Sequence, residues 1–147
     1  MYEYKCNIVK VIDGDTVDVD IDLGFGMWML DERVRIMGID TPESRTRDLV
    51  EKKFGLAAKK RLIELLGKSA VLATQVNKNG EDMKGKFGRI LGDFNVYDST
   101  TDSWRKSGEV LVSEGHAVEY LGQNKEDIQE AHMANRKKLL ESGVVDL

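Results

Sequence analysis

Residues 15–23 read Asp15-Thr16-Val17-Asp18-Val19-Asp20-Ile21-Asp22-Leu23. Apolar and acidic side chains alternate from residue 17 onward, which is the period-two pattern of a β-strand with one buried face. On this register the side chains at 17, 19, 21 and 23 point into the core, and the aspartates at 18, 20 and 22 point into solvent. Asp15 shares the core side. Burial of an unpaired carboxylate is costly, so we expect Asp15 at the mouth of the fold, where a cation or an arginine compensates its charge.

The segments on either side of this strand predict an α+β fold built on a small closed β-barrel. Turn residues bound four further runs rich in β-branched or apolar residues, which predict strands over 4–12, 33–39, 70–76 and 88–97. Apolar residues at helical spacing predict helices over 50–66, 109–114 and 125–142. Their ends are marked by Gly67, Gly115 and Gly143, and the last helix has Asn124 as its N-cap. Five short strands with one helix inserted and two appended favour a closed barrel.

Composition describes a globular chain whose charge is unevenly distributed. The 147 residues are 41% hydrophobic and 33% charged, with one proline and no candidate linker, so residues 1–147 are expected to form a single domain. Residues 1–44 hold ten acids and four bases, a net charge of −6, whereas residues 45–61 hold seven bases and two acids, a net charge of +5. This arrangement suits a site that holds a cation and receives a polyanion. Because charge runs are more often solvated surfaces, composition leaves both readings open.

The sequence lacks the signals of membrane, secreted and zinc-binding proteins. No apolar stretch is long enough to cross a bilayer, and residues 1–5 do not resemble the start of a signal peptide. The single cysteine, Cys6, has no internal disulfide partner. We therefore expect a cytoplasmic protein with no membrane partner. His116 and His132 are isolated and do not show zinc-ligand spacing. The apolar residues 27–30 are expected in a connection, as lid packing, core packing or a partner surface.

A second cluster of charged residues offers the chemistry of phosphodiester cleavage. Asp40 and Glu43 lie three residues apart on a turn that a proline stiffens. One carboxylate can bind a hard metal ion through oxygen while the other acts as a general base. Arg35 can bind a phosphate oxygen through its planar fork, and Arg89 follows a glycine at the start of a strand. Each piece alone has a structural explanation, as a turn or a helix entry.

Together these pieces resemble the staphylococcal (thermonuclease) nuclease family in order and spacing. The resemblance rests on Ile12-Asp13-Gly14-Asp15-Thr16, on Arg35 five residues before Asp40-Thr41-Pro42-Glu43, and on Phe87-Gly88-Arg89, and it extends over residues 5–142. It implies a five-stranded OB-type β-barrel with three α-helices. It also implies a calcium-dependent endonuclease that hydrolyses DNA and RNA with low sequence selectivity.

The resemblance also assigns roles to residues of this chain. It implies that Asp15, Asp40 and the carbonyl oxygen of Thr41 bind Ca²⁺, and that Glu43 activates the attacking water. It implies that Arg35 and Arg89 bind the phosphate and stabilise its transition state.

Three further residues are candidates for substrate binding. Phe87 stands where the family often has a tyrosine, which removes a phenolic contact to a terminal phosphate, and Lys86 beside it can supply positive charge. Tyr120 is a candidate for stacking on a base. We expect a monomer. The rivals are a non-catalytic OB-type module that binds nucleic acid or a peptide, and a purely structural subunit.

Overall fold

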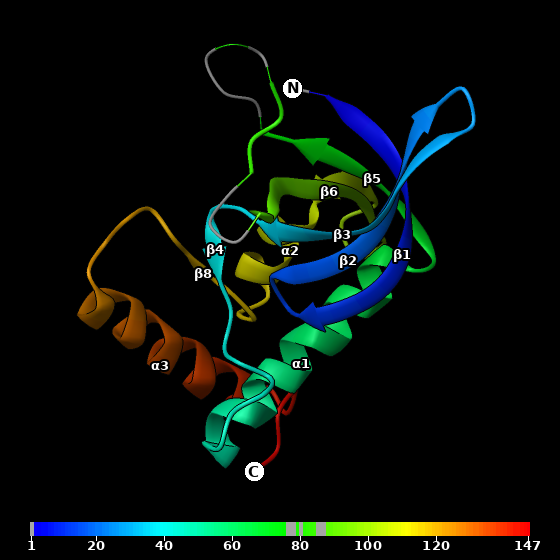
Figure 1. Cartoon of the computed structure of the whole chain (residues 1–147). Coiled ribbons are helices and arrows are strands. Elements are labelled where there is room, and N and C mark those ends of the chain that lie inside the picture. The colour runs from blue at the N-terminus through cyan, green and yellow to red at the C-terminus, as the bar shows by residue number, and fades with distance from the viewer. Residues whose placement is uncertain (1, 76–78, 80, 85–87) are drawn as a thin grey trace.

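The computed structural model describes residues 2–75, 79, 81–84 and 88–147 (Figure 1). Its elements, in chain order, are β1 (Glu3–Asp13), β2 (Thr16–Gly24), β3 (Met27–Ile36), β4 (Ile39–Asp40), α1 (Leu49–Leu66), β5 (Ser69–Thr74), β6 (Ile90–Asp98), β7 (Ser103–Lys106), α2 (Ser107–Ser113), β8 (Val118–Glu119) and α3 (Lys125–Glu141).

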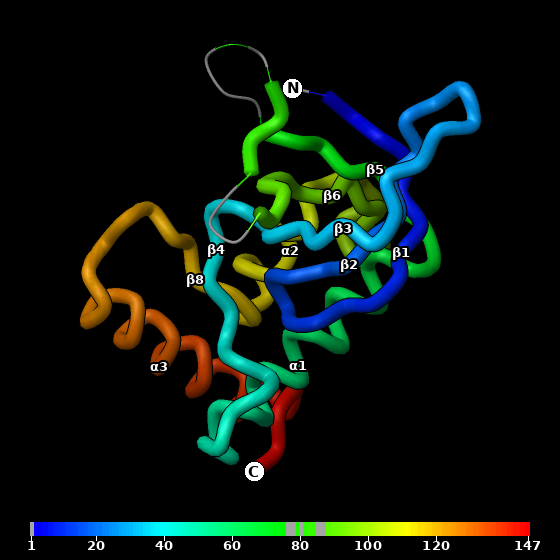
Figure 2. The backbone as a smooth tube through the Cα atoms, in the orientation of Figure 1, coloured from blue at the N-terminus to red at the C-terminus, as the bar shows by residue number. Residues whose placement is uncertain are grey.

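Five strands form a closed sheet in the order β3-β2-β1-β5-β6, and a parallel pairing of β3 with β6 closes it. Figure 2 shows the closure, which pairs residues 34–36 of β3 with residues 90–92 of β6. β7 extends the sheet beyond β6, while β4 and β8 form a separate two-stranded sheet. The predicted α+β architecture, an OB-type closed sheet with three helices, is therefore confirmed, although the barrel is irregular. The short strands β7 and β8 were not predicted from the sequence.

The alternation in β2 builds the core as predicted along most of the strand. Val17, Val19 and Ile21 are buried, and together with Val34, Leu72 and Phe94 they belong to the main apolar cluster. The prediction is wrong for Leu23, which is 41% exposed. Beyond Ile21 the strand leaves the barrel, and β2 and β3 continue as a two-stranded ribbon that projects from it (Figure 1). The inward side of the strand therefore has no core to enter at residue 23.

The aspartates on the outer face of β2 are not simply solvated, contrary to expectation. The carboxylate of Asp18 accepts two hydrogen bonds from Arg33 on β3, at 2.9 and 3.1 Å, and is only 15% exposed. Asp20 and Asp22 each accept a backbone N–H from the ribbon, those of Asp31 and Gly24 at 2.8 Å. These carboxylates hold the ribbon and its turn together.

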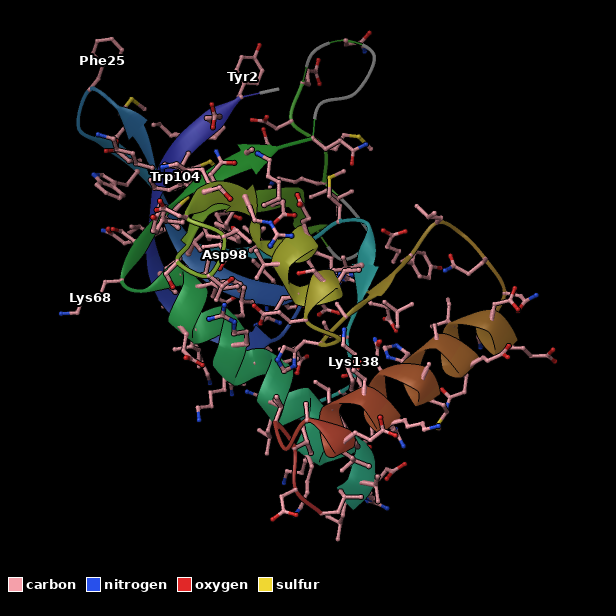
Figure 3. The ribbon with its side chains drawn as sticks, turned by 180° about the vertical axis from the view of Figure 1, so that it is seen from behind. Tyr2, Phe25, Lys68, Asp98, Trp104 and Lys138 are labelled. Carbon is pink, nitrogen blue, oxygen red and sulfur yellow. The ribbon has the colours of Figure 1, made fainter. Side chains whose placement is uncertain are left out.

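Residues 27–30 belong to the ribbon, so their predicted place in a connection is wrong. They form the first part of β3, where Trp28 pairs with Asp22 and Met29 with Ile21. Met29 packs against the core, whereas Met27, Trp28 and Leu30 are exposed. Phe25 lies at the free end of the ribbon and is fully exposed (Figure 3). Residues 27–30 pair with β2 as a strand, but the ribbon extends past the barrel. Most of their apolar side chains therefore have no core to enter.

The three helices begin and end close to the predicted residues. Asp48 caps α1 by accepting the N–H groups of Val50 and Glu51, and Gly67 ends it with a φ of 62°. Asn124 caps α3 and accepts the N–H of Asp127, as predicted. The described helices include none that is both long and apolar enough to cross a membrane. Figure 1 shows α1 running under the barrel and α3 lying beside β4 and β8.

Candidate functional site

The predicted site begins at the turn between β1 and β2, where Asp15 points toward the segment that follows β4. Its side chain is only 13% exposed. One carboxylate oxygen accepts the hydroxyl of Thr16 at 2.9 Å, and the other accepts the backbone N–H of Thr41 at 3.3 Å. Arg35 Nη2 lies 3.5 Å from that second oxygen. The structure thus brings Asp15 to an arginine, which is one of the two forms of compensation expected from the sequence.

Arg35 is held by backbone carbonyl groups at the end of β3. Its Nη1 donates a hydrogen bond to the carbonyl of Ile36, and its Nη2 donates to that of Ile39 at 2.8 Å. These contacts brace the short turn between β3 and β4 against the guanidinium. The side chain is 20% exposed, so the guanidinium is oriented on a side chain that is not fully buried. Such an oriented planar fork is suited to recognise a phosphate group.

Asp40 and Thr41 lie at the end of β4, next to Asp15. The Asp40 carboxylate is 37% exposed, and one of its oxygens lies 2.7 Å from Nε2 of His132 on α3. The hydroxyl oxygen of Thr41 is buried and has no hydrogen-bond partner among the described residues. The sequence gives His132 no cysteine or histidine partner at zinc-ligand spacing. Its partner is 92 residues away, so only the folded chain could identify it.

Glu43 is exposed and lies among other acids. Its backbone N–H donates a hydrogen bond to Oε2 of Glu51 on α1 at 2.9 Å. Partial desolvation is the largest cause that raises the pKa of the Glu43 carboxyl above its ordinary value. A second cause is the negative charge of four neighbouring carboxylates: Asp13, Asp15, Glu51 and Asp40. A carboxylate with a raised pKa is a stronger base, as proton abstraction from water requires.

Small residues in α1 allow this segment to approach the helix closely. A Cβ atom at Gly55 would lie 2.2 Å from the backbone oxygen of Glu43 and 2.7 Å from the nitrogen of Ser44. A Cβ atom at Gly14 would lie 2.8 Å from that of Ala58 in the same helix. The absent side chains at 14 and 55 therefore set the position of Glu43 relative to the barrel.

We expect Gly55→Ala to destabilise the protein and to displace Glu43. Overpacking of this kind costs about 1–3 kcal/mol, and the better helix propensity of alanine offsets about 1 kcal/mol of it. A displacement of about 1 Å at a reacting group costs up to about a hundredfold in turnover. Thermal melting and steady-state cleavage of DNA measure both effects. Leu56→Ala, at an exposed position of the same helix, is the control, and equal losses in both variants would contradict the packing argument.

Of the remaining predicted residues, Arg89 and Tyr120 are among the described residues. Arg89 directly precedes β6, whose residues Ile90 and Leu91 pair with Val34 and Arg35. Arg35 therefore lies on β3, and Arg89 lies immediately before β6, the strand that pairs with it. Tyr120 follows β8, is 48% exposed, and lines a pocket of about 360 Å³ together with Asp40, Thr41, Glu43 and His132. Asp15, Arg35 and Arg89 do not line this pocket. Lys86 and Phe87 lie outside the described residues.

The donors at the site are of the hard-oxygen type that calcium prefers. They are the carboxylates of Asp15 and Asp40 and the backbone carbonyl of Thr41, with the unpartnered hydroxyl of Thr41 close by. Among the described residues, no three His, Cys, Asp or Glu side chains form a metal-binding group. Side chains of the described chain therefore supply only part of a coordination shell, and water or substrate oxygens would have to supply the rest.

Comparison with known proteins agrees with the fold. Residues 33–140 match the family model described as staphylococcal nuclease homologue. The match takes in Arg35, Glu43, Arg89 and nearly all of α3, while Asp15 precedes it. A search of curated proteins found no match. Because the matched region covers most of the chain, the protein belongs to the staphylococcal nuclease homologue family.

Proposed function

We propose that the protein is a calcium-dependent endonuclease that hydrolyses the phosphodiester bonds of DNA and RNA with low sequence selectivity. Family membership supports a nuclease or nucleic-acid-binding role. One observation favours catalysis: Asp15 contacts both Arg35 and the backbone of Thr41, at the segment that also carries Asp40 and Glu43. A module that only binds phosphates has no use for carboxylates here, because they repel the ligand unless a cation lies between them.

The proposed chemistry assigns a distinct task to each group. Asp15, Asp40 and the Thr41 carbonyl hold the calcium ion, which supplies positive charge for the phosphate when it is bound. Glu43 takes a proton from a water molecule as that water attacks phosphorus. One ester oxygen leaves and takes a proton from solvent. Arg35 and Arg89 donate to the non-bridging oxygens, where negative charge develops.

The positive charge on the surface of α1 favours a polyanionic substrate. Lys52, Lys53 and Lys60 are exposed on this helix, which follows the segment that carries Glu43. The Nζ of Lys53 also donates a hydrogen bond to the carbonyl of Asp146 at 3.1 Å. Neutralisation of phosphates by such lysines releases counterions and favours binding at low salt.

We further propose that residues 1–147 act as one domain. β1 and β2 precede the matched region, yet both belong to the closed sheet through their pairings with β5 and β3. The Asp15 turn between them is consequently part of the same body as the rest of the site.

Cleavage of supercoiled plasmid DNA tests the proposed function. We expect nicking in calcium, its loss when a calcium chelator is present in excess, and its recovery when calcium is restored. Gel-shift binding of the same DNA, with and without calcium, is the accompanying measurement. Undiminished cleavage in chelator would contradict the metal assignment. Binding without cleavage in calcium would instead favour the non-catalytic binding module.

A further inference from the structure

The contact between His132 and Asp40 joins α3 to the proposed metal site. Nε2 of His132 lies 2.7 Å from Oδ2 of Asp40, and the histidine side chain is only 11% exposed. An ionised carboxylate only accepts hydrogen bonds, so the ring nitrogen is the donor. Within the described residues, this is the one hydrogen bond recorded for the Asp40 carboxylate. The other oxygen, Oδ1, remains available for a cation.

The position of His132 follows from how α3 is anchored to the body of the protein. Asn135 donates a hydrogen bond from Nδ2 to the carbonyl of Ala117 at 3.1 Å. Leu139 is buried with Phe54 and Val145, and the guanidinium of Arg136 lies over the Phe54 ring at 5.2 Å.

The anchors and His132 lie on one face of α3, because residues three, four and seven apart share a side of a helix. The last turns of α3 make a further contact, in which Nζ of Lys138 donates a hydrogen bond to the carbonyl of Ser113 on α2 at 3.3 Å (Figure 3). Tertiary contacts after His132 therefore hold its ring against Asp40.

The strand that carries Asp40 needs such support. β4 contains only two residues, and its pairing partner β8 is equally short. Asp40 pairs with Val118, the residue after Ala117, so the Asn135 contact and the His132 contact reach the same small sheet. The sheet fixes the backbone of Asp40, but the carboxylate is 37% exposed and is free to rotate unless something holds it.

We propose that His132 is a positioning residue that fixes the Asp40 carboxylate for calcium. This inference rests on the proposed function, because it takes Asp40 as a calcium ligand. With Oδ2 held by His132, Oδ1 is oriented before the ion arrives, and binding does not have to order the side chain. Loss of a hydrogen-bond partner behind a metal ligand typically weakens metal binding about ten- to a hundredfold.

A calorimetric titration of the purified full chain with calcium chloride alone tests the inference. Its readout is calcium affinity and does not depend on nuclease activity. We expect His132→Ala to weaken calcium binding at least about tenfold. His132→Gln should stay within about threefold of wild type, since its amide can donate to the same carboxylate oxygen. Asn135→Ala is the matched control, because it removes one anchoring hydrogen bond one turn away on the same face, while the contacts of Arg136, Lys138 and Leu139 still dock α3. It should bind calcium like wild type.

The outcomes separate this inference from the proposed function. Equal calcium affinity in wild type and His132→Ala would overturn the inference and leave the calcium assignment intact. An equal loss in Asn135→Ala, or no rescue by glutamine, would assign His132 only to the docking of α3 and would also overturn it. Absence of calcium binding by wild type would overturn the calcium assignment itself, and the inference with it. Thermal melting in chelator checks that all variants are folded. If His132→Ala is unfolded, the calcium affinities of His132→Gln and wild type decide the outcome.

Discussion

Glu43→Gln should lower turnover about a hundred- to ten-thousandfold, the usual cost of losing a general base. Glutamine keeps the size and the hydrogen-bonding capacity of the side chain but cannot take a proton from water. Glu51→Gln is the matched control. Glu51 lines the same pocket, and its Oε2 accepts the backbone N–H of Glu43, so this variant removes a negative charge at the site and keeps an acceptor. Steady-state cleavage of DNA in calcium compares the three proteins.

A similar loss in both glutamine variants would show that net charge at the pocket governs the rate, and Glu43 would lose its role as base. Undiminished turnover in Glu43→Gln would have the same consequence.

Glu43→Gln should also stabilise the metal-free protein at neutral pH. The pKa of Glu43 is raised in the folded state, chiefly by partial desolvation and further by its acidic neighbours. The folded state therefore binds the proton more tightly than the unfolded chain does, and folding is opposed once the carboxyl ionises. Thermal melting in chelator should show a higher melting temperature for Glu43→Gln above the raised pKa. The difference should vanish below the ordinary pKa of glutamate, and a constant difference across that range would contradict this account.

Arg35→Ala should lower turnover about a hundred- to a thousandfold, because one donor to the developing negative charge is lost. It should also destabilise the fold. The guanidinium donates to the carbonyls of Ile36 and Ile39 and lies 3.5 Å from the Asp15 carboxylate. A hydrogen bond that involves a charged group contributes about 1.5–3 kcal/mol. Arg35→Lys should recover charge but not the planar fork, so it should recover only part of the activity.

Arg33→Ala is the control for Arg35. Arg33 lies on the same strand and also pairs with an aspartate, but its side chain is 50% exposed and the pair lies on the outer face of the sheet. Exposed pairs of this kind contribute about 0–1 kcal/mol. Its removal should leave cleavage unchanged and melting nearly so. Comparable losses of activity in the two alanine variants would indicate a general effect of charge rather than a specific role of Arg35.

The sequence by itself determined most of the elements and indicated the family of this protein. The alternation through Ile21, the Asn124 cap and the Gly67 terminus depend on residues within one or two turns of each other, so local patterns report them directly. The family resemblance was found for a similar reason, because each of its three motifs, around Asp15, around Arg35 to Glu43 and around Arg89, is a short continuous segment.

Only the tertiary structure decided where the apolar alternation stops building the core. It also decided which residues far apart in the sequence meet. Leu23 and residues 27–30 follow an apolar pattern, yet most of their side chains lie on a ribbon outside the barrel, where there is no core to receive them. The approach of Gly55 to Glu43 and the contact of His132 with Asp40 join a helix to a turn or strand. Such contacts depend on how whole elements pack, and packing is set by side chains that a local pattern does not contain.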